Sequence, residues 1–457
     1  MNTYAPITTG LANKWATAVP RPVLEARWSW AFAGLLFYTF IEYTRLPEMY
    51  PVLAGFKIGL VALILTTLFY LFSPRVLNSG RVRTRGLDIG ISTFVLANFI
   101  SACLAPSRGY VWSQCLNLLE LSFLYFLITR ILTNSWRVRI FVFLVLLLNL
   151  KMAQFTIRDY QNQRAMGISD MRVIVGGGAG AGTKAYFGNA ADLGLAMVVV
   201  LAITFALLFG KTEKKKLPRF FLLVCFALFL LAILFCGSRG AVVGAAAVVT
   251  VALARTPKKM GAIAAALIFL FCIWFILPDA SKERFRNAWN GDDKNAASRL
   301  HFWGVGIQMF SDYPVFGVGP GNFPFMYATQ YSDTGKPWAC HSLYIQALSE
   351  SGVVGAAVCA ALLMLLVRLN ARTRKLVLSL WGPEGKRRFE YCLAIGLDLA
   401  LVGYLTSGAF LSVLYYPHLW ILLGLSVAAH TACINTSPEQ KTANSQGPQR
   451  EFSFGAP

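Results

Sequence analysis

Long apolar runs recur along almost the whole chain, and they limit its possible folds more than any other feature. About twelve runs are long enough, at roughly 17 to 25 residues, to cross about 30 Å of hydrocarbon as helices. Hydrophobic residues make up 56% of the 457 residues and charged residues 14%. These values exclude an ordinary soluble domain and predict an all-α polytopic membrane protein. The runs lie near 28–44, 50–72, 87–105, 110–131, 139–156, 191–209, 219–236, 240–254, 260–277, 341–367, 390–412 and 415–433.

The two ends of the chain differ from the apolar region between them. Residues 1–27 contain no short apolar core before a small-residue cleavage site, so we expect a cytoplasmic N-terminal segment and a first helix that directs its own insertion. Residues 28–434 form the predicted transmembrane domain. Residues 435–457 are rich in Ser, Pro, Gln, Gly and Asn, which predicts a disordered cytoplasmic tail. The nine cysteines lie mostly inside the apolar runs and give no disulfide framework.

Basic residues gather in alternate connections between the runs, and this predicts the orientation. By the positive-inside rule, the connections near 75–85, 130–139, 211–219, 255–259 and 368–388, together with both termini, face the cytoplasm. The net charge of +21 is explained by these loops, and no soluble basic domain is present to bind nucleic acid. The outer side then receives the turns near Arg45, Arg108 and Arg239, a loop at 157–190, and a long segment at 278–340 between the ninth and tenth helices.

The outer loop at 157–190 combines positive charge with glycine. Five glycines between 176 and 182 give it backbone freedom, which is typical of a mobile flap. The glycine run lacks the G-K-[ST] ending and the preceding buried strand of a phosphate-binding loop, so it does not indicate nucleotide binding. The basic residues of this loop are candidates for substrate binding: Arg158, Arg164, Arg172 and Lys184.

Three outer residues are candidates for chemistry. Arg239 lies between two consecutive apolar runs with almost no loop, where an ionised side chain is unfavourable unless it is paired or used. Arg299 lies in the sequence S-R-L-H-F-W at 298–303, whose pattern suggests an amphipathic helix on the membrane surface. His341 opens the next apolar run, where a helix N-terminus and nearby arginines keep an imidazole neutral and able to accept a proton.

Structural explanations remain open for each of the three residues. Arg239 can extend to the membrane interface, Arg299 can be a plain surface residue, and His341 can cap or pack its helix. Between Arg299 and His341 lies the sequence P-V-F-G-V-G-P-G-N-F at 314–323, whose glycines allow tight backbone paths and exposed N–H groups.

The order of these motifs resembles the O-antigen ligase and O-antigen polymerase superfamily. The motifs are S-R-G-A at 238–241, S-R with a following Trp at 298–303, the glycine-rich sequence at 314–323, and H-S-L-Y with E-S-G at 341–352. An upstream F-G-N-A-A-D-L-G at 187–194 looks like the family's F-G-N-x-N-D segment, with Ala191 in place of the second Asn. The resemblance covers residues 187–355 in motifs and nearly the whole chain in topology.

The resemblance implies a bacterial inner-membrane glycosyltransferase with a GT-C-like architecture and an active site facing the periplasm. Such enzymes take a glycan from undecaprenyl diphosphate and transfer it to an acceptor hydroxyl. Arg239 and Arg299 would then bind the donor diphosphate, and His341 would act at the acceptor as a base or a positioning group. Guanidinium groups can stabilise the leaving diphosphate without a metal or other cofactor, and direct displacement inverts the anomeric carbon. The remaining candidates for substrate binding are Asn189, Asp192, Trp303, Asn322 and Tyr344.

Three acceptors separate the relatives within this superfamily. Ligases use lipid A-core oligosaccharide, polymerases use another carrier-linked glycan, and protein O-oligosaccharyltransferases use a Ser or Thr. We expect a ligase, because the chain is short, lacks a large extra C-terminal domain, and carries outer positive charges suited to the phosphates of lipid A-core. A transporter of lipid-linked oligosaccharide is a different class of hypothesis, but it predicts internal repeats or a charged path to both faces, and the sequence shows neither.

Overall fold

The computed structural model describes residues 28–44, 56, 58–73, 85–167, 190–210, 212, 216–255, 259–290 and 294–435. Within these residues every regular element is helical and no strand occurs, which confirms the predicted all-α class. The helices are α1 (Trp30–Thr44), α4 (Ile58–Leu71), α6 (Arg85–Leu104), α7 (Val111–Ile131), α8 (Ser135–Ala165), α11 (Ala190–Phe209), α12 (Lys216–Phe235), α13 (Arg239–Ala254), α14 (Lys259–Ile276), α15 (Asp279–Asn290), α16 (Lys294–Asp312), α17 (Phe323–Gln330), α18 (Leu343–Trp381), the 3-10 helix η2 (Gly382–Arg387), α19 (Phe389–Gly408) and α20 (Pro417–Asn435).

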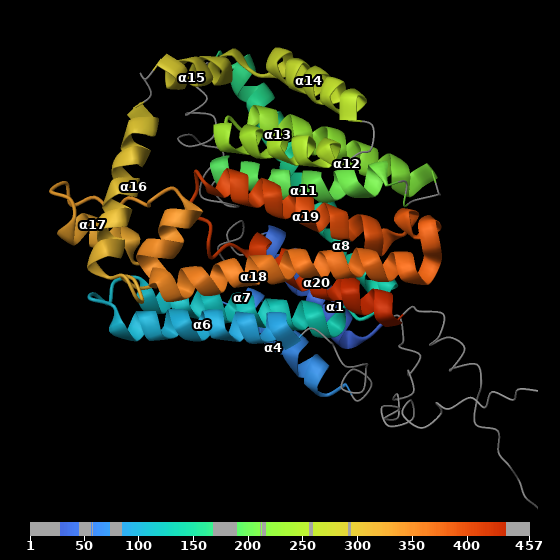
Figure 1. The fold of residues 1–457 in the computed structure, drawn as a ribbon, viewed down its shortest axis with the longest axis horizontal. Helices are drawn as coiled ribbons and strands as arrows, with labels where there is room; N and C mark the ends of the chain where they lie inside the picture. The colour runs from blue at the N-terminus through green and yellow to red at the C-terminus, as the bar shows by residue number, and fades with distance from the viewer. Residues whose placement is uncertain are drawn as a thin grey trace, which may run out of the picture.

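The long helices lie side by side in one bundle, and α16 runs across one end of it (Figure 1). We call this the capped end; it holds α16, α17 and the start of α18. Helix α11 is central, because it packs on α12, α13 and α19 and nearly all of its side chains between Asp192 and Thr204 are buried. A helix that is apolar all round and enclosed in this way has no lipid-facing stripe. The core of the protein therefore lies around α11 and α19.

Eight helices in the described part of the chain are long and apolar enough to span a membrane. They are α6, α7, α8, α11, α12, α18 with η2, α19 and α20, and the shorter apolar helices α4 and α13 accompany them. Each of the twelve predicted runs overlaps a helix, but the count of twelve spans and the GT-C architecture stay predictions. Several apolar helices of this length make the chain a multi-pass membrane protein.

Helix α8 extends further along the chain than the sequence predicts. Residues 157–165, expected as the start of an outer loop, continue α8 to Ala165. The segment contains no Gly or Pro that would end a helix. At 31 residues, α8 is about 46 Å long, more than the hydrocarbon needs, so its last turns extend beyond it. Arg158 and Arg164 are therefore helical residues. Residues 168–189 lie outside the described residues, as do 1–27 and the tail beyond Asn435.

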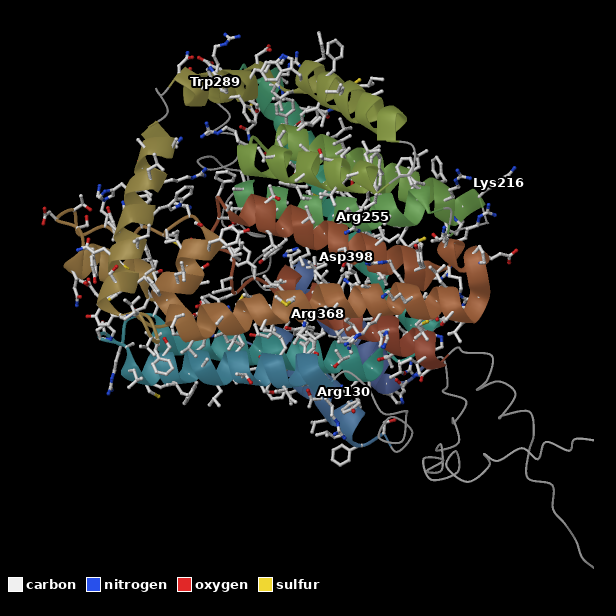
Figure 2. The ribbon with its side chains drawn as sticks, viewed as in Figure 1. Arg130, Lys216, Arg255, Trp289, Arg368 and Asp398 are labelled. Carbon is white, nitrogen blue, oxygen red and sulfur yellow. The ribbon has the colours of Figure 1, made fainter. Side chains whose placement is uncertain are left out.

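A buried carboxylate joins three helices part-way along the bundle. Asp398 of α19, with 2% of its side chain exposed, accepts a hydrogen bond from Arg374 of α18 at 2.5 Å and another from Asn370 at 2.9 Å. Arg255, at the end of α13, lies 3.7 Å from the same carboxylate. Figure 2 shows Arg255 and Asp398 on neighbouring helices away from both ends of the bundle. The cluster joins α13 and α18 to α19.

Replacing Asp398 by alanine is expected to destabilise the protein by about 2–5 kcal/mol, because Arg374 then loses its buried counter-ion. The measurement is the thermal unfolding temperature of the purified protein in detergent. Asp279→Ala is the matched control: Asp279 also pairs with a cation, Lys282 at 3.1 Å, but its side chain is 99% exposed. That pair contributes little. Equal unfolding temperatures for the two variants would contradict the proposed clamp.

Candidate functional site

His341 lies at the capped end, in the connection just before α18. Its backbone has φ of 52°, and it is the only non-glycine residue in the described part of the chain with a positive φ. Its N–H donates a hydrogen bond to Ser412 Oγ at 2.9 Å. The left-handed region is unfavourable for a side chain of this kind and persists where the surroundings enforce it, often at functional sites. The next residue, Ser342, caps α18, because its hydroxyl oxygen accepts a hydrogen bond from Ile345 N. This cap fixes where α18 begins.

Arg299 and His341 belong to different elements, yet they lie within electrostatic reach of each other. Burial lowers the pKa of His341, and the positive charge of Arg299 lowers it further. This direction agrees with the expectation of a neutral imidazole, and burial is the larger of the two causes. A neutral imidazole keeps a lone pair that can accept a proton from a hydroxyl.

Helix α16 positions Arg299 through an aromatic cluster one turn further along. The Phe302 ring lies 6.1 Å from the His341 ring and 6.1 Å from the Trp338 ring, and it meets Tyr327 edge-on at 5.3 Å. Residues three apart on a helix share a face, so Arg299 and Phe302 project toward the same side. Phe302 is buried, whereas Trp338 is 48% exposed and offers a ring surface beside the site. His301 hydrogen-bonds Tyr327 at 3.2 Å instead.

Arg239 is the first residue of α13, at the capped end. Ser238 caps this helix by accepting a hydrogen bond from Ala241 N at 3.3 Å. The next residue, Gly240, packs against Phe410 and receives a hydrogen bond from Ser407 at its carbonyl oxygen. Phe410 in turn lies 6.5 Å, ring to ring, from Trp303 of α16. The structure therefore connects the position of Arg239 to the helix that carries Arg299 through a single pair of aromatic rings.

The glycine-rich sequence, residues 314–323 and here called the glycine loop, is held against α18. Its backbone N–H groups at Val318 and Gly319 donate to the carbonyl oxygens of Ser349 and Glu350 at 2.8 and 3.0 Å. The buried carboxylate of Glu350 accepts from Gly321 N at 3.0 Å and from Phe323 N at 3.4 Å. These contacts replace water for the loop's polar backbone. The loop is thus a fixed support under the capped end.

Helix α18 bends where the glycine loop crosses it. Gly352 has φ of 62° and ψ of −168° inside the helix, and Val353 N donates to Pro314 O at 2.8 Å. A Cβ placed on Gly352 would lie 2.3 Å from Val315 O, closer than real Cβ contacts allow. Glycine is therefore required at this position both for its backbone conformation and for the close approach of the loop.

Gly352→Ala is expected to lower the stability of the protein by more than about 2 kcal/mol, because the cost of about 1–3 kcal/mol for a side chain at this φ and ψ adds to the clash. The measurement is the thermal unfolding temperature of the purified protein in detergent. Gly304→Ala on α16 is the control, since nothing lies within 4 Å of its Cβ position and its backbone is helical. A Gly352→Ala protein as stable as Gly304→Ala would show that the loop does not constrain this position.

Two predicted substrate-binding residues make hydrogen bonds within the fold. Asn322 is fully buried, and its amide donates to Ser107 O at 3.1 Å and Val318 O at 2.9 Å, so it holds the glycine loop. A contact of Asn322 with substrate stays a prediction. Tyr344 donates to Leu405 O at 3.1 Å and joins α18 to α19 while 47% of it stays exposed. A contact of Tyr344 with substrate stays a prediction. The ring of Trp303 packs near Phe410, as described above.

Asp192 lies in the first turn of α11, beside the turn that carries Arg239. Its carboxylate accepts a hydrogen bond from Tyr416 at 2.7 Å, and the nearby Gly194 packs on Cys236, Ser238 and Ala241. The chain segment that contains Tyr416 also contains Ser412, the partner of His341. Arg158 and Arg164 are on α8, where Arg158 lies over the ring of Phe155. Asn189, Arg172 and Lys184 lie outside the described residues.

Several residues of the site carried no signal in the sequence. Ser412, Phe302, Trp338 and Tyr416 act through contacts with segments far away in the chain. Glu350 had a signal, since an acidic residue in an apolar helix needs a partner or a task. Cys340, next to His341, is a buried thiol whose pKa is raised to about 12, chiefly by burial and then by the charge of Glu350. It is therefore not a nucleophile. No group of three or more His, Cys, Asp or Glu side chains suited to a metal occurs among the described residues.

Comparison with known proteins adds one family. Residues 224–360 match the family model described as O-antigen ligase. The matched segment includes Arg239, Arg299, the glycine loop and His341, and it ends in α18 shortly after the bend at Gly352. No curated protein matches the chain.

Proposed function

Because residues 224–360 carry the O-antigen ligase family domain, we propose that the chain is an O-antigen ligase of a bacterial inner membrane. It transfers a glycan from undecaprenyl diphosphate to a hydroxyl of lipid A-core oligosaccharide, in lipopolysaccharide biosynthesis. The capped end faces the periplasm, as the distribution of basic connections predicts. The observation that supports this best is the approach of Arg299 to a neutral, conformationally constrained His341 within the matched segment.

The arginines provide charge where the donor leaves. Breaking the bond between the sugar C1 and the diphosphate oxygen leaves negative charge on the lipid diphosphate, and a guanidinium can hold two of its oxygens at once. Phe410 lies between the helices of the two arginines, since it packs against Gly240, next to Arg239, and against Trp303 of the helix that carries Arg299. We infer that one diphosphate binds between the two arginines. Such a site needs no divalent cation, and the reaction is proposed to be metal-independent.

His341 acts on the acceptor. Its neutral imidazole takes the proton of the attacking hydroxyl as the oxygen bonds to C1 on the face opposite the diphosphate, so the anomeric configuration is inverted. The bond to the diphosphate breaks in the same step, and the diphosphate keeps the electron pair. Exclusion of water by the aromatic cluster around Phe302 favours transfer over hydrolysis.

The test is transfer by the purified protein in detergent, in the presence of EDTA, with lipid-linked glycan as donor and three separate acceptors. We expect a product with lipid A-core and none with a second carrier-linked glycan or an acceptor protein. Product with the second glycan would identify a polymerase, and product with protein an O-oligosaccharyltransferase of the same superfamily. Movement of the donor across sealed vesicles without any product would identify a transporter and overturn the proposal.

A further inference from the structure

A cavity lies between α1, α7 and the start of α20, on helices that do not carry Arg299 or His341. Its volume is about 270 Å³. The described polar residues that line it are Tyr38, Thr39, Glu42 and Tyr43 from α1, Asn117 and Glu120 from α7, and Tyr416 and His418. Glu42 and Pro417, which line it, are exposed, so the cavity reaches the molecular surface. Glu42 lies in the last turn of α1 and His418 in the first turn of α20.

The charge of the described lining disfavours the phosphate groups of both substrates. Among the described residues that line the cavity, two are carboxylates and none is Lys or Arg. Two negative side chains repel a diphosphate or the phosphates of lipid A-core. Carboxylates instead accept hydrogen bonds from hydroxyl groups, and the phenols and the amide of Asn117 can both donate and accept. The faces of Tyr rings offer apolar contact to the C–H surface of a sugar.

The size and preorganisation of the cavity agree with one sugar ring. A volume of 270 Å³ corresponds to the share of roughly nine liquid water molecules, enough for a single ring but not for a longer glycan. The Tyr38 hydroxyl donates to Glu120 Oε1 at 3.2 Å, which fixes one oxygen of this carboxylate and leaves the other for a ligand. Asn117 Nδ2 contacts Tyr415 O at 3.5 Å. The polar groups are thus oriented by the protein itself.

The cavity and the candidate site share one chain segment. Residues 409–416 connect α19 to α20; within them Ser412 accepts the hydrogen bond of His341 N, and Tyr416 both lines the cavity and donates to Asp192 at 2.7 Å. Leu414 N between them donates to Gln346 Oε1 at 3.1 Å. A ligand against Tyr416 therefore touches the segment that holds His341 in place.

We propose that this cavity is a subsite for one sugar ring that carries no negative charge, in a glycan that the protein handles. The proposal rests on the proposed function for the presence of glycans, and two glycans qualify: the one on the carrier and the core oligosaccharide of the acceptor. Both glycans present sugar hydroxyl groups, which are the groups that the cavity would bind. Glu120 and Glu42 are the residues that bind it, and the diphosphate stays with Arg239 and Arg299.

The experiment measures equilibrium binding of each glycan alone to the purified full-length protein, so no transfer can occur. The probes are core oligosaccharide released from lipid A and glycan released from the carrier. Glu120→Gln is expected to weaken the binding of one of them by about tenfold or more, since a hydrogen bond to a charged group is lost. The glycan that is affected identifies the source. Glu42→Gln, at an exposed side chain, gives a second variant if Glu120→Gln does not fold.

Glu384→Gln is the control, because Glu384 is exposed in η2 and far from the cavity lining in sequence and fold. Unchanged affinity of Glu120→Gln and Glu42→Gln for both glycans would overturn the subsite, as would an equal loss in Glu384→Gln. The transfer assay on the unmodified protein separates the two proposals. If the unmodified protein transfers glycan but the variants bind both glycans normally, the proposed function stands and the subsite is wrong. If binding depends on Glu120 but no transfer occurs, the subsite stands and the proposed function is wrong.

Discussion

His341→Ala is expected to abolish glycan transfer, with a loss of about 10²- to 10⁴-fold, while the protein still inserts and accumulates. The reason is the loss of the neutral imidazole that accepts the proton of the attacking hydroxyl. The variant should still fold, since alanine retains the backbone N–H that donates to Ser412. Product formation from lipid-linked glycan and lipid A-core is the measurement, with protein level and unfolding temperature recorded for the same preparation.

His301→Ala is the matched control for this prediction. His301 is also at the capped end and also contacts an aromatic ring. Its Nε2, however, is hydrogen-bonded to the hydroxyl of Tyr327 in α17 at 3.2 Å. Its removal should change the rate several-fold at most. Near-normal transfer by His341→Ala, or an equal loss in both variants, would remove His341 from the mechanism.

Arg299→Gln is expected to lower transfer by about 10²- to 10³-fold, because one positive group that stabilises the leaving diphosphate is lost. Glutamine keeps much of the side-chain length and polarity, so packing changes little. Arg299→Lys keeps the charge but not the two-pronged geometry and should retain part of the activity. Rates at saturating donor and acceptor, with the three proteins compared at one concentration, give the result.

The same substitution should change the titration of His341 in a defined direction. In the folded protein the pKa of His341 lies below its usual 6.5, through burial first and the Arg299 charge second. A base of this kind loses activity as the pH falls through that pKa. In Arg299→Gln the second cause disappears, so the pKa rises while burial still keeps it below 6.5. The acidic limb of the pH–rate profile then moves to higher pH.

Diethyl pyrocarbonate gives a reading of the same pKa that does not depend on activity, because it modifies only the neutral imidazole. The extent of His341 modification is measured by mass spectrometry over a range of pH, and it decreases as the pH is lowered through the pKa. The midpoint of this decrease should lie at a higher pH in Arg299→Gln than in the unmodified protein. Identical profiles would show that Arg299 does not act on His341. A shift to lower pH would contradict the sign of the interaction.

The helices followed from the sequence because their cause is local. A run of apolar residues long enough to cross a membrane must satisfy its own backbone hydrogen bonds, and only a helix does so within one segment. All twelve runs accordingly overlap helices. The same reasoning placed Arg239 at a tight turn between two apolar helices, where Ser238 caps α13. It was wrong at 157–165, because polar residues do not end a helix unless a stop signal accompanies them.

The tertiary structure decided how the site is assembled. Arg299 and His341 are far apart in the chain, and their approach depends on the packing of α16 against α18, which no local pattern contains. The positive φ of His341 is imposed by the segment 409–416, and the bend at Gly352 by the glycine loop. The cavity between α1, α7 and α20 also arises from helix packing alone. The sequence thus determines the residue types and predicts their depth in the membrane. Contacts between residues far apart in the chain are determined only by the packing of the helices against one another.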